Sequence, residues 1–324
     1  MFKRSLAVAG ALACVQAISS RAADLKDFPA QTHWVLTVDV KAAQASPLMT
    51  SLTEKMDPAK RQEATNKLAA VKAMFGVDLL KDIDQLVIAG NGDAEKGGVA
   101  YVYGKFDAQR LSTILAGTKN YVSADHNGVV VQSWTDEKDN KQKCLAFAKP
   151  GLALLSNTQA TLTDALDVLS GKKAGLAPGS PLSGAFERNG QNLLTLHAYG
   201  LSSIVGAAPR AEALKQAESL SLCVGTPGAD ALNATLSVTA GTEQTAQQIQ
   251  QALLGIQAIA MLRATEAPES ASVASQAKIT CRNRTVDVTL DLTKDLIGNV
   301  LRARQARHAT QGADAAAPAP AKTN

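Results

Sequence analysis

The sequence predicts an α+β protein made of two similar units, each a mainly antiparallel sheet with helices packed on one face. Two stretches, 233–239 and 285–292, alternate polar and apolar residues without interruption. This period of two is typical of antiparallel strands with one wet face and one buried face. Apolar residues at helical spacing, such as those of 249–260, lie between such strands, and both halves show a comparable order of elements.

The chain has 324 residues, a length that suits about two domains. We expect a first α+β unit over 23–171 and a second over 191–308. The stretch 172–190 contains Gly, Pro and Ser with little periodicity and is predicted to be a linker. Residues 1–22 form a predicted signal peptide, and residues 309–324, rich in Ala and Pro, are predicted to be a disordered tail.

In the first unit, helix starts are the clearest local signals. Ser46-Pro47 and Asp57-Pro58 each place a capping side chain before a proline at the first helical position. Gly76 is expected to end the second of these helices. Asp107 is expected to begin another, whose Leu111, Ile114 and Leu115 face inward. Asn127-Gly128 predicts a tight hairpin turn. The expected strands of this unit are 33–40, 82–89, 99–103, 129–134, 143–148 and 152–156, followed by a helix that Asn157 or Thr158 caps and Gly171 closes.

In the second unit we expect a strand at 192–199 and a short helical piece near 209–216. A hairpin of 219–224 and 232–239 follows. Thr245 and Gln248 fit a capping box for the next helix. The final helix is expected over 295–307. An alternative to duplication is that the two halves are unrelated α+β structures. The match between them rests on the order of the elements and the phase of their apolar residues, and few residues are identical.

The N-terminus has the features of a secretory signal peptide. Lys3 and Arg4 precede an apolar run over 6–18, and small residues stand at −3 and −1 of a cut after Ala22. The run is too short for a membrane span, which needs about 20 apolar residues. Cys14 raises the alternative of a lipoprotein, although Ala11 stands where a lipobox has a bulky aliphatic residue. The mature chain is therefore predicted to be secreted or periplasmic, with no transmembrane segment.

The chain combines four features: this N-terminus, the Ser46-Pro47 helix start, the hairpin at 82–103 and the strand–helix unit 152–171. In this pattern it is similar to uncharacterised secreted bacterial proteins built as duplicated α+β halves. The resemblance implies the architecture alone and supplies no catalytic residue.

Charge and composition argue against nucleic-acid binding. Three of the 33 basic residues lie in 1–22, so the mature chain has 30 basic and 29 acidic residues. A nearly neutral chain with 4% aromatic residues lacks both the basic surface and the stacking platforms that nucleic acids need. Cys144, Cys223 and Cys281 remain after cleavage. Because Cys223 and Cys281 fall on opposite strand faces, no disulfide between them is expected.

No catalytic, cofactor-binding or metal-binding residue is predicted. His33, His126, His197 and His308 are isolated, and no zinc, phosphate-loop or nucleophile-elbow motif occurs. His197 could approach His33 if the first strands of the two units are adjacent, but a structural histidine is the simpler interpretation. Two acids, Asp39 and Asp84, could form a carboxylate pair, although solvated strand ends are the simpler reading.

Three functions remain open. The preferred one is a non-enzymatic binding or interaction protein, possibly a carrier of an apolar ligand, whose partner is an unknown protein or a small apolar molecule. The second is an extracytoplasmic hydrolase with a dispersed site, in which a histidine, an acid and a nucleophile converge. The third is a structural or assembly protein.

Overall fold

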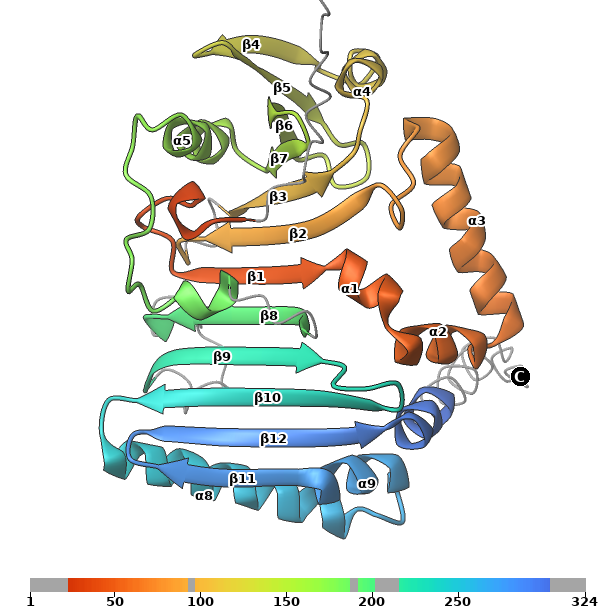
Figure 1. The fold of residues 1–324 in the computed structure, drawn as a ribbon, viewed down its shortest axis with the longest axis vertical. Helices are drawn as coiled ribbons and strands as arrows, with labels where there is room; N and C mark the ends of the chain where they lie inside the picture. Colours follow the sequence, from red (N-terminus) through yellow and green to blue (C-terminus); the bar gives the residue numbers. More distant parts are fainter. Residues whose placement is uncertain (1–22, 93–96, 187–191, 202–215, 304–324) are drawn as a thin grey trace, which may run out of the picture.

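The computed structural model describes residues 23–92, 97–186, 192–201 and 216–303, and all structural statements refer to these residues. They form one antiparallel sheet of 12 strands in the order β11-β12-β10-β9-β8-β1-β2-β3-β7-β6-β5-β4 (Figure 1). The strands are β1 Trp34–Asp39, β2 Ile83–Gly90, β3 Gly98–Gly104, β4 Val122–His126, β5 Val129–Thr135, β6 Gln142–Lys149, β7 Leu152–Ser156, β8 Asn192–Tyr199, β9 Ala217–Gly225, β10 Ala231–Ala240, β11 Ala277–Arg282 and β12 Thr285–Thr293. The predicted α+β class and antiparallel pairing are confirmed.

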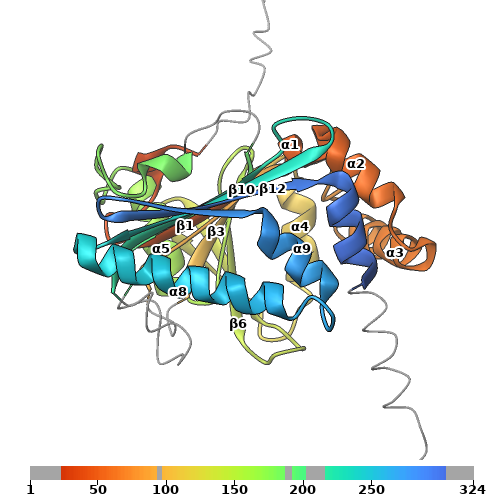
Figure 2. The ribbon, with the colours of Figure 1, turned by 90° about the horizontal axis from the view of Figure 1, so that it is seen from below.

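Helices lie on both faces of the sheet and beyond one end of its strands (Figures 1 and 2). The helices are α1 Val40–Ala45, α2 Pro47–Glu54, α3 Pro58–Phe75, α4 Ala108–Leu115, α5 Gln159–Leu169, α8 Glu243–Leu262 and α9 Pro268–Gln276, with 3-10 turns at Leu25–Asp27 (η1) and Ser183–Phe186 (η2). Residues 294–303 are also helical. Within the described part of the chain, no helix is long and apolar enough to cross a membrane.

The predicted helix starts at Ser46, Asp57 and Asp107 are confirmed. Ser46 accepts a hydrogen bond from the Met49 amide, and Pro47 occupies the first turn of α2. Gly76 ends α3 in the left-handed conformation with φ of 72°. The capping box at Thr245 and Gln248 is wrong, because Thr242 caps α8 by accepting from the Thr245 amide. Helix α8 therefore begins one turn earlier than the apolar stripe indicated.

The two halves meet at β1 and β8, which pair as antiparallel neighbours. The predicted first strands of the two units are thus adjacent in the middle of one continuous sheet. The duplication itself is not confirmed. The predicted linker is packed rather than extended into solvent: Leu176, Leu182 and Ala185 are at most 5% exposed, and Gly175 bridges to Pro29.

One face of the sheet, which we call the Tyr101 face, carries the main core. Tyr101, Val87 and Leu154 point to this side and pack against Leu162 and Leu166 of α5. Phe28 lies on Tyr101 with ring centroids 4.5 Å apart. In the second half of the sheet the same face is half-buried and rich in hydroxyl groups, as the alternating strands predicted. These hydroxyl residues include Ser219, Ser221, Thr235, Ser237, Thr239, Thr285 and Thr289.

The opposite face, which we call the Trp34 face, is apolar across both halves. Strand pairing aligns one residue of each of ten successive strands in a single apolar row: Ile279, Val288, Leu236, Leu222, Leu196, Leu36, Ile88, Ala100, Leu155 and Leu145. Helices α8 and α9 pack over one end of this face and α4 over the other. A long apolar surface therefore links two helix-covered ends.

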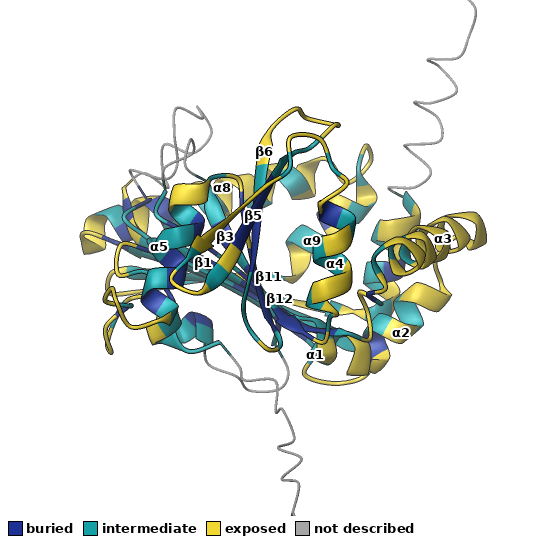
Figure 3. Cartoon of the chain, turned by 90° about the horizontal axis from the view of Figure 1, so that it is seen from above, coloured by how far each residue is buried: buried dark blue, intermediate teal, exposed yellow. Residues whose placement is uncertain are grey.

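Three features were not predicted. The prediction that helices pack on one face is wrong for the first half, where α4 and α5 lie on opposite faces of the sheet, since Leu115 packs with Leu145 whereas Leu162 joins the Tyr101 core. Helix α9 and strand β4 were not anticipated as elements. Helix α3 carries no fully buried residue: Leu68, Val71 and Phe75 on its apolar side are half-buried, and the rest of the helix is exposed (Figure 3).

Several sequence predictions lie outside the described residues. These are the signal peptide at 1–22, most of the helical piece near 209–216, the end of the last helix and the tail at 309–324. The predicted placement of Cys223 and Cys281 on opposite faces agrees with the strand pairing, because Cys223 is opposite Thr235 and Cys281 opposite Val286.

Candidate ligand-binding groove

The histidines predicted as isolated occupy separate environments. His33 Nδ1 lies 2.8 Å from the Asn91 carbonyl oxygen, and its ring packs on Tyr199 at 4.8 Å. His197 stands opposite Val35 and lies against Gly184, where an added Cβ would come within 2.8 Å of the imidazole. The two first strands are neighbours, and the two histidines contact different residues in the described part of the chain.

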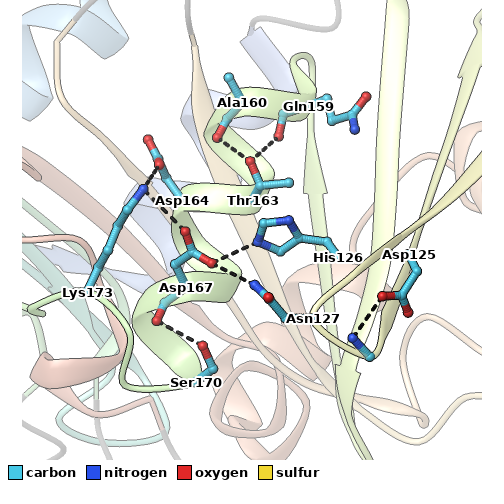
Figure 4. A network of polar contacts seen from close by, with 11 residues as sticks. Asp125, His126, Asn127, Gln159, Ala160, Thr163, Asp164, Asp167, Ser170 and Lys173 are labelled. Carbon is cyan, nitrogen blue, oxygen red and sulfur yellow. Dashed lines mark hydrogen bonds and ion pairs between the residues drawn. The ribbon is translucent and has the colours of Figure 1, made fainter.

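His126 forms the one histidine–carboxylate contact found in the described residues. Its Nε2 lies 2.8 Å from Asp167 Oδ1, and the Asn127 amide donates to the same oxygen at 3.1 Å. Lys173 Nζ lies 3.3 Å from the other Asp167 oxygen and also contacts Asp164. Figure 4 shows this network between the β4–β5 turn and α5. The His126 hydrogen bond is the main cause that lowers the pKa of Asp167.

This network stabilises the attachment of the edge hairpin to α5. A nucleophilic site would need a hydroxyl or thiol on the second ring nitrogen of His126. Among the residues that the structure describes, no serine, threonine or cysteine side chain is hydrogen-bonded to that ring. The Ser170 hydroxyl instead donates to the Asp167 carbonyl oxygen at 3.0 Å.

The two acids considered as a carboxylate pair have separate roles. Asp39 caps α1 by accepting from the Ala42 amide at 2.8 Å. Asp84 was expected at a solvated strand end, which is wrong: it is 7% exposed at the irregular start of β2 and contacts Lys41 Nζ at 2.6 Å. Across the described ranges, no three His, Cys, Asp or Glu side chains come together in a group that could hold a metal ion.

An apolar cavity of about 500 Å³ lies beside α4. It lies between the end of α3, helix α4 and the Trp34 face of β3, β5, β6 and β7. Sixteen of its 18 lining residues are apolar, and Thr118 and Asp136 are the two exceptions. We call this cavity the α4 groove. Its wall includes Phe75, Val102, Leu115, Trp134, Phe147 and Leu155.

Helix α3 reaches the groove only with its last turn. The Arg110 guanidinium of α4 donates to the Ala73 carbonyl oxygen at 3.3 Å and fills the space beside Gly76. This contact holds the end of α3 against α4, and Met74 on that turn remains 60% exposed. An exposed apolar rim therefore surrounds the entrance of the groove.

A second cavity of about 430 Å³ continues the α4 groove along β6 and β7. The two cavities share Trp134, Asp136 and Leu155 in their walls. The second one also contains Lys143, Ser156 and Asn157, so its end is polar. The two adjoining cavities are apolar on the α4 side and polar on the Lys143 side.

Other cavities exist in the described part of the chain. One of about 610 Å³ lies between α8, α9 and the β11–β12 edge, with Ile256 and Ile279 in its wall. Another of about 550 Å³ lies where α5 begins, with Thr158 and Asp164 in its wall. Tyr101 also borders the latter and has a fully buried hydroxyl without a hydrogen-bond partner.

Sequence reasoning did not find the α4 groove. It identified Leu111, Ile114 and Leu115 as inward-facing, and all three line the groove. The gap between α4 and the sheet could not be predicted, because it depends on how residues from several distant elements pack. One sequence signal for the groove was present: alternate residues of β3, β6 and β7 are apolar on the side that faces the groove rather than the Tyr101 core.

The chain matches no family model and no curated protein. The solved structure of TP0453 in crystal form I aligns with 87% of this chain and 98% of its own, with a TM-score of 0.47 and 9% identity. A likeness at this level carries no argument about function.

Proposed function

We propose that this protein binds a small apolar ligand in the α4 groove, outside the cytoplasm, without transforming it chemically. The observation that carries the proposal is the lining of the groove, in which 16 of 18 residues are apolar. Known small-molecule sites are concave, mostly apolar and about 300–1,000 Å³ in volume. The groove, at about 500 Å³, falls within that range.

The walls of the groove are formed by well-packed elements. Leu115, Leu145 and Ala153 are buried at its base, and Phe106 and Phe147 contact each other at 5.7 Å. Leu155 and Met74 at its entrance are instead exposed to 37% and 60%. A ligand that covers these side chains gains the hydrophobic free energy of their burial, about 25 cal/mol per Å². This combination of a fixed base and an uncovered rim suits reversible binding.

The extracytoplasmic location rests on the N-terminal sequence, with its basic start, short apolar run and small residues before Ala23. A binding protein for apolar molecules has a clear role in such a compartment. These molecules have low aqueous solubility, so their transport through it requires a protein that shields them from water. The test of location is the N-terminal residue of the exported protein, which should be Ala23.

Binding can be tested with a neutral apolar dye, N-phenyl-1-naphthylamine, whose fluorescence rises in apolar surroundings. The wild-type protein should bind one dye molecule in a saturable manner. Leu155→Glu should weaken binding by at least about tenfold, because it places an unpaired carboxylate against the apolar wall. Its matched control is Leu254→Glu, a change at a leucine of α8 that is 43% exposed and lines neither cavity of the groove.

A second variant separates the α4 groove from the cavity at α8 and α9. Ile256 is 63% exposed and lines that other cavity, so Ile256→Glu should leave dye binding unchanged. Absence of saturable binding by the wild-type protein would contradict the proposal. Loss of binding in Ile256→Glu but not in Leu155→Glu would move the site to the other cavity.

The hydrolase alternative has the His126–Asp167 contact in its favour. If it is correct, the wild-type protein should cleave a soluble ester or peptide substrate and His126→Ala should abolish that cleavage. If the contact is structural, His126→Ala should lower the thermal midpoint and leave dye binding in the α4 groove unchanged.

A further inference from the structure

The groove and its continuation differ in polarity from one end to the other. At the α4 end the wall contains Phe75, Phe106 and Leu111, and at the other end it contains Lys143, Ser156 and Asn157. Trp134 and Leu155 belong to both cavities and join the two ends. A space of this kind fits a molecule with one apolar chain and one polar head better than a wholly apolar molecule.

The polar end carries one cation with an unused donor. Lys143 Nζ forms an ion pair with Asp139 Oδ2 and a hydrogen bond to Asn157 Oδ1, each at 3.1 Å. An ammonium group has three N–H donors, so one donor remains without a partner among the described residues. The Lys143 side chain is 26% exposed, which leaves it reachable from the cavity that it lines.

The polar end also carries a carboxylate without a cationic partner. Asp136 Oδ1 accepts a hydrogen bond from the Lys138 amide at 2.8 Å, and no side-chain cation of the described residues forms an ion pair with it. Asp136 lines both cavities. Trp134, two residues earlier, stands directly opposite Lys143 in the β5–β6 pairing. The head of a bound molecule would therefore meet a cation, a carboxylate and an indole ring.

We infer that the ligand of this groove is a single-chain amphiphile with a zwitterionic head, whose anionic group binds Lys143 and whose cationic group lies at Asp136 and Trp134. This inference rests on the proposed apolar-ligand function and specifies its ligand class. A purely anionic head would place its charge beside Asp136, and a purely cationic head beside Lys143. A head with both charges can accept from the remaining Lys143 N–H and place its cation at Asp136, and a quaternary ammonium is also attracted to the face of an indole ring.

The test uses four molecules with the same dodecyl chain: dodecylphosphocholine, dodecyl phosphate and dodecyltrimethylammonium, each below its micelle concentration, and dodecanol below its solubility limit. Each displaces the neutral dye from the full-length mature protein. The wild-type protein should bind dodecylphosphocholine about tenfold more tightly than the other three, as one or two charge-assisted hydrogen bonds allow.

Two variants should change this preference in opposite directions. Lys143→Gln should remove the advantage of dodecylphosphocholine over dodecyltrimethylammonium, and Asp136→Asn should remove its advantage over dodecyl phosphate. Lys141→Gln is the matched control, since Lys141 is exposed and lines neither cavity, and it should leave the order of affinities unchanged. Lys143→Arg should retain the wild-type order.

The outcomes separate this inference from the function on which it rests. If the neutral dye binds and Leu155→Glu weakens it, but the four dodecyl compounds bind equally, the apolar site stands and the zwitterionic ligand is refuted. Equal effects of Lys143→Gln on all four compounds would also refute it. If the wild-type protein does not bind the neutral dye, the proposed function itself fails.

Discussion

The buried hydroxyl of Tyr101 should make this protein less stable than its phenylalanine variant. Tyr101 is 0% exposed, and its hydroxyl has no hydrogen-bond partner among the residues that the structure describes. The ring itself is well packed, against Phe28 at 4.5 Å. Tyr101→Phe keeps that packing and removes only the unpaired polar atom, so we expect the free energy of unfolding to increase.

The magnitude follows from the cost of an unsatisfied buried polar group, about 1–3 kcal/mol. Loss of one oxygen atom leaves a small void that offsets about 0.5 kcal/mol of this gain. The net stabilisation should be about 1–2 kcal/mol. For a protein of this size, each kcal/mol raises the thermal midpoint by about 2–4 °C.

The matched control is Tyr121→Phe, which removes the same atom from a tyrosine that uses it. Tyr121 donates to Gln132 Oε1 at 3.2 Å, and Gln132 is 2% exposed. Its removal leaves a buried amide oxygen without this donor, so Tyr121→Phe should destabilise the protein by about 1 kcal/mol. The two variants should therefore change stability in opposite directions although the chemical change is identical.

Urea denaturation and thermal unfolding at neutral pH measure both effects, and alkaline titration adds an independent one. Burial raises the pKa of Tyr101 well above its usual value near 10. For a group whose folded pKa is raised, the stabilising contribution is complete below the unfolded pKa and is lost as the pH rises above it. Wild-type stability should thus fall above about pH 10 more steeply than that of Tyr101→Phe. A Tyr101→Phe variant as destabilised as Tyr121→Phe would refute the reasoning.

Two further predictions concern the edge hairpin and the Trp34 face. Asp167→Asn should lower the thermal midpoint at neutral pH more than Asp164→Asn. Because the folded pKa of Asp167 is lowered, chiefly by His126, the difference from wild type should shrink as the pH falls below the ordinary aspartate range; a difference that is independent of pH would contradict this. Gly90→Ala should displace the Trp34 indole, since the added Cβ would lie 2.8 Å from it, and shift Trp34 fluorescence in a Trp134→Phe background. Gly228→Ala, where nothing lies within 4 Å, should do neither.

Local features of the fold could be predicted because their causes are local. Ser46, Asp57 and Asp107 cap helices through hydrogen bonds that span three residues or fewer. Alternation in β10 and β12 predicted which side chains face the hydroxyl-rich side, and the register of the two strands agrees. Thr242 and Thr245 both place a hydroxyl near the start of α8. The capping-box pattern predicted Thr245 as the cap, whereas Thr242 caps the helix.

The candidate site could not be predicted, because no single segment contains it. Phe75, Trp134 and Leu155 come from α3, β5 and β7, and each alone reads as an ordinary core residue. The environment of Asp84 could not be predicted either. Its contact with Lys41 exists only because β1 and β2 pair. Such contacts join residues that are tens of positions apart.

By itself, the sequence determined that the chain is an α+β protein with antiparallel strands, and where most of its helices begin, since side-chain periodicity and capping act within a few residues. Only the tertiary structure decided that β1 and β8 join both halves into one sheet, that α4 and α5 pack on opposite faces, and that a groove opens beside α4. These arrangements depend on which apolar faces meet across the whole sheet, and many pairings of such faces satisfy the same local pattern.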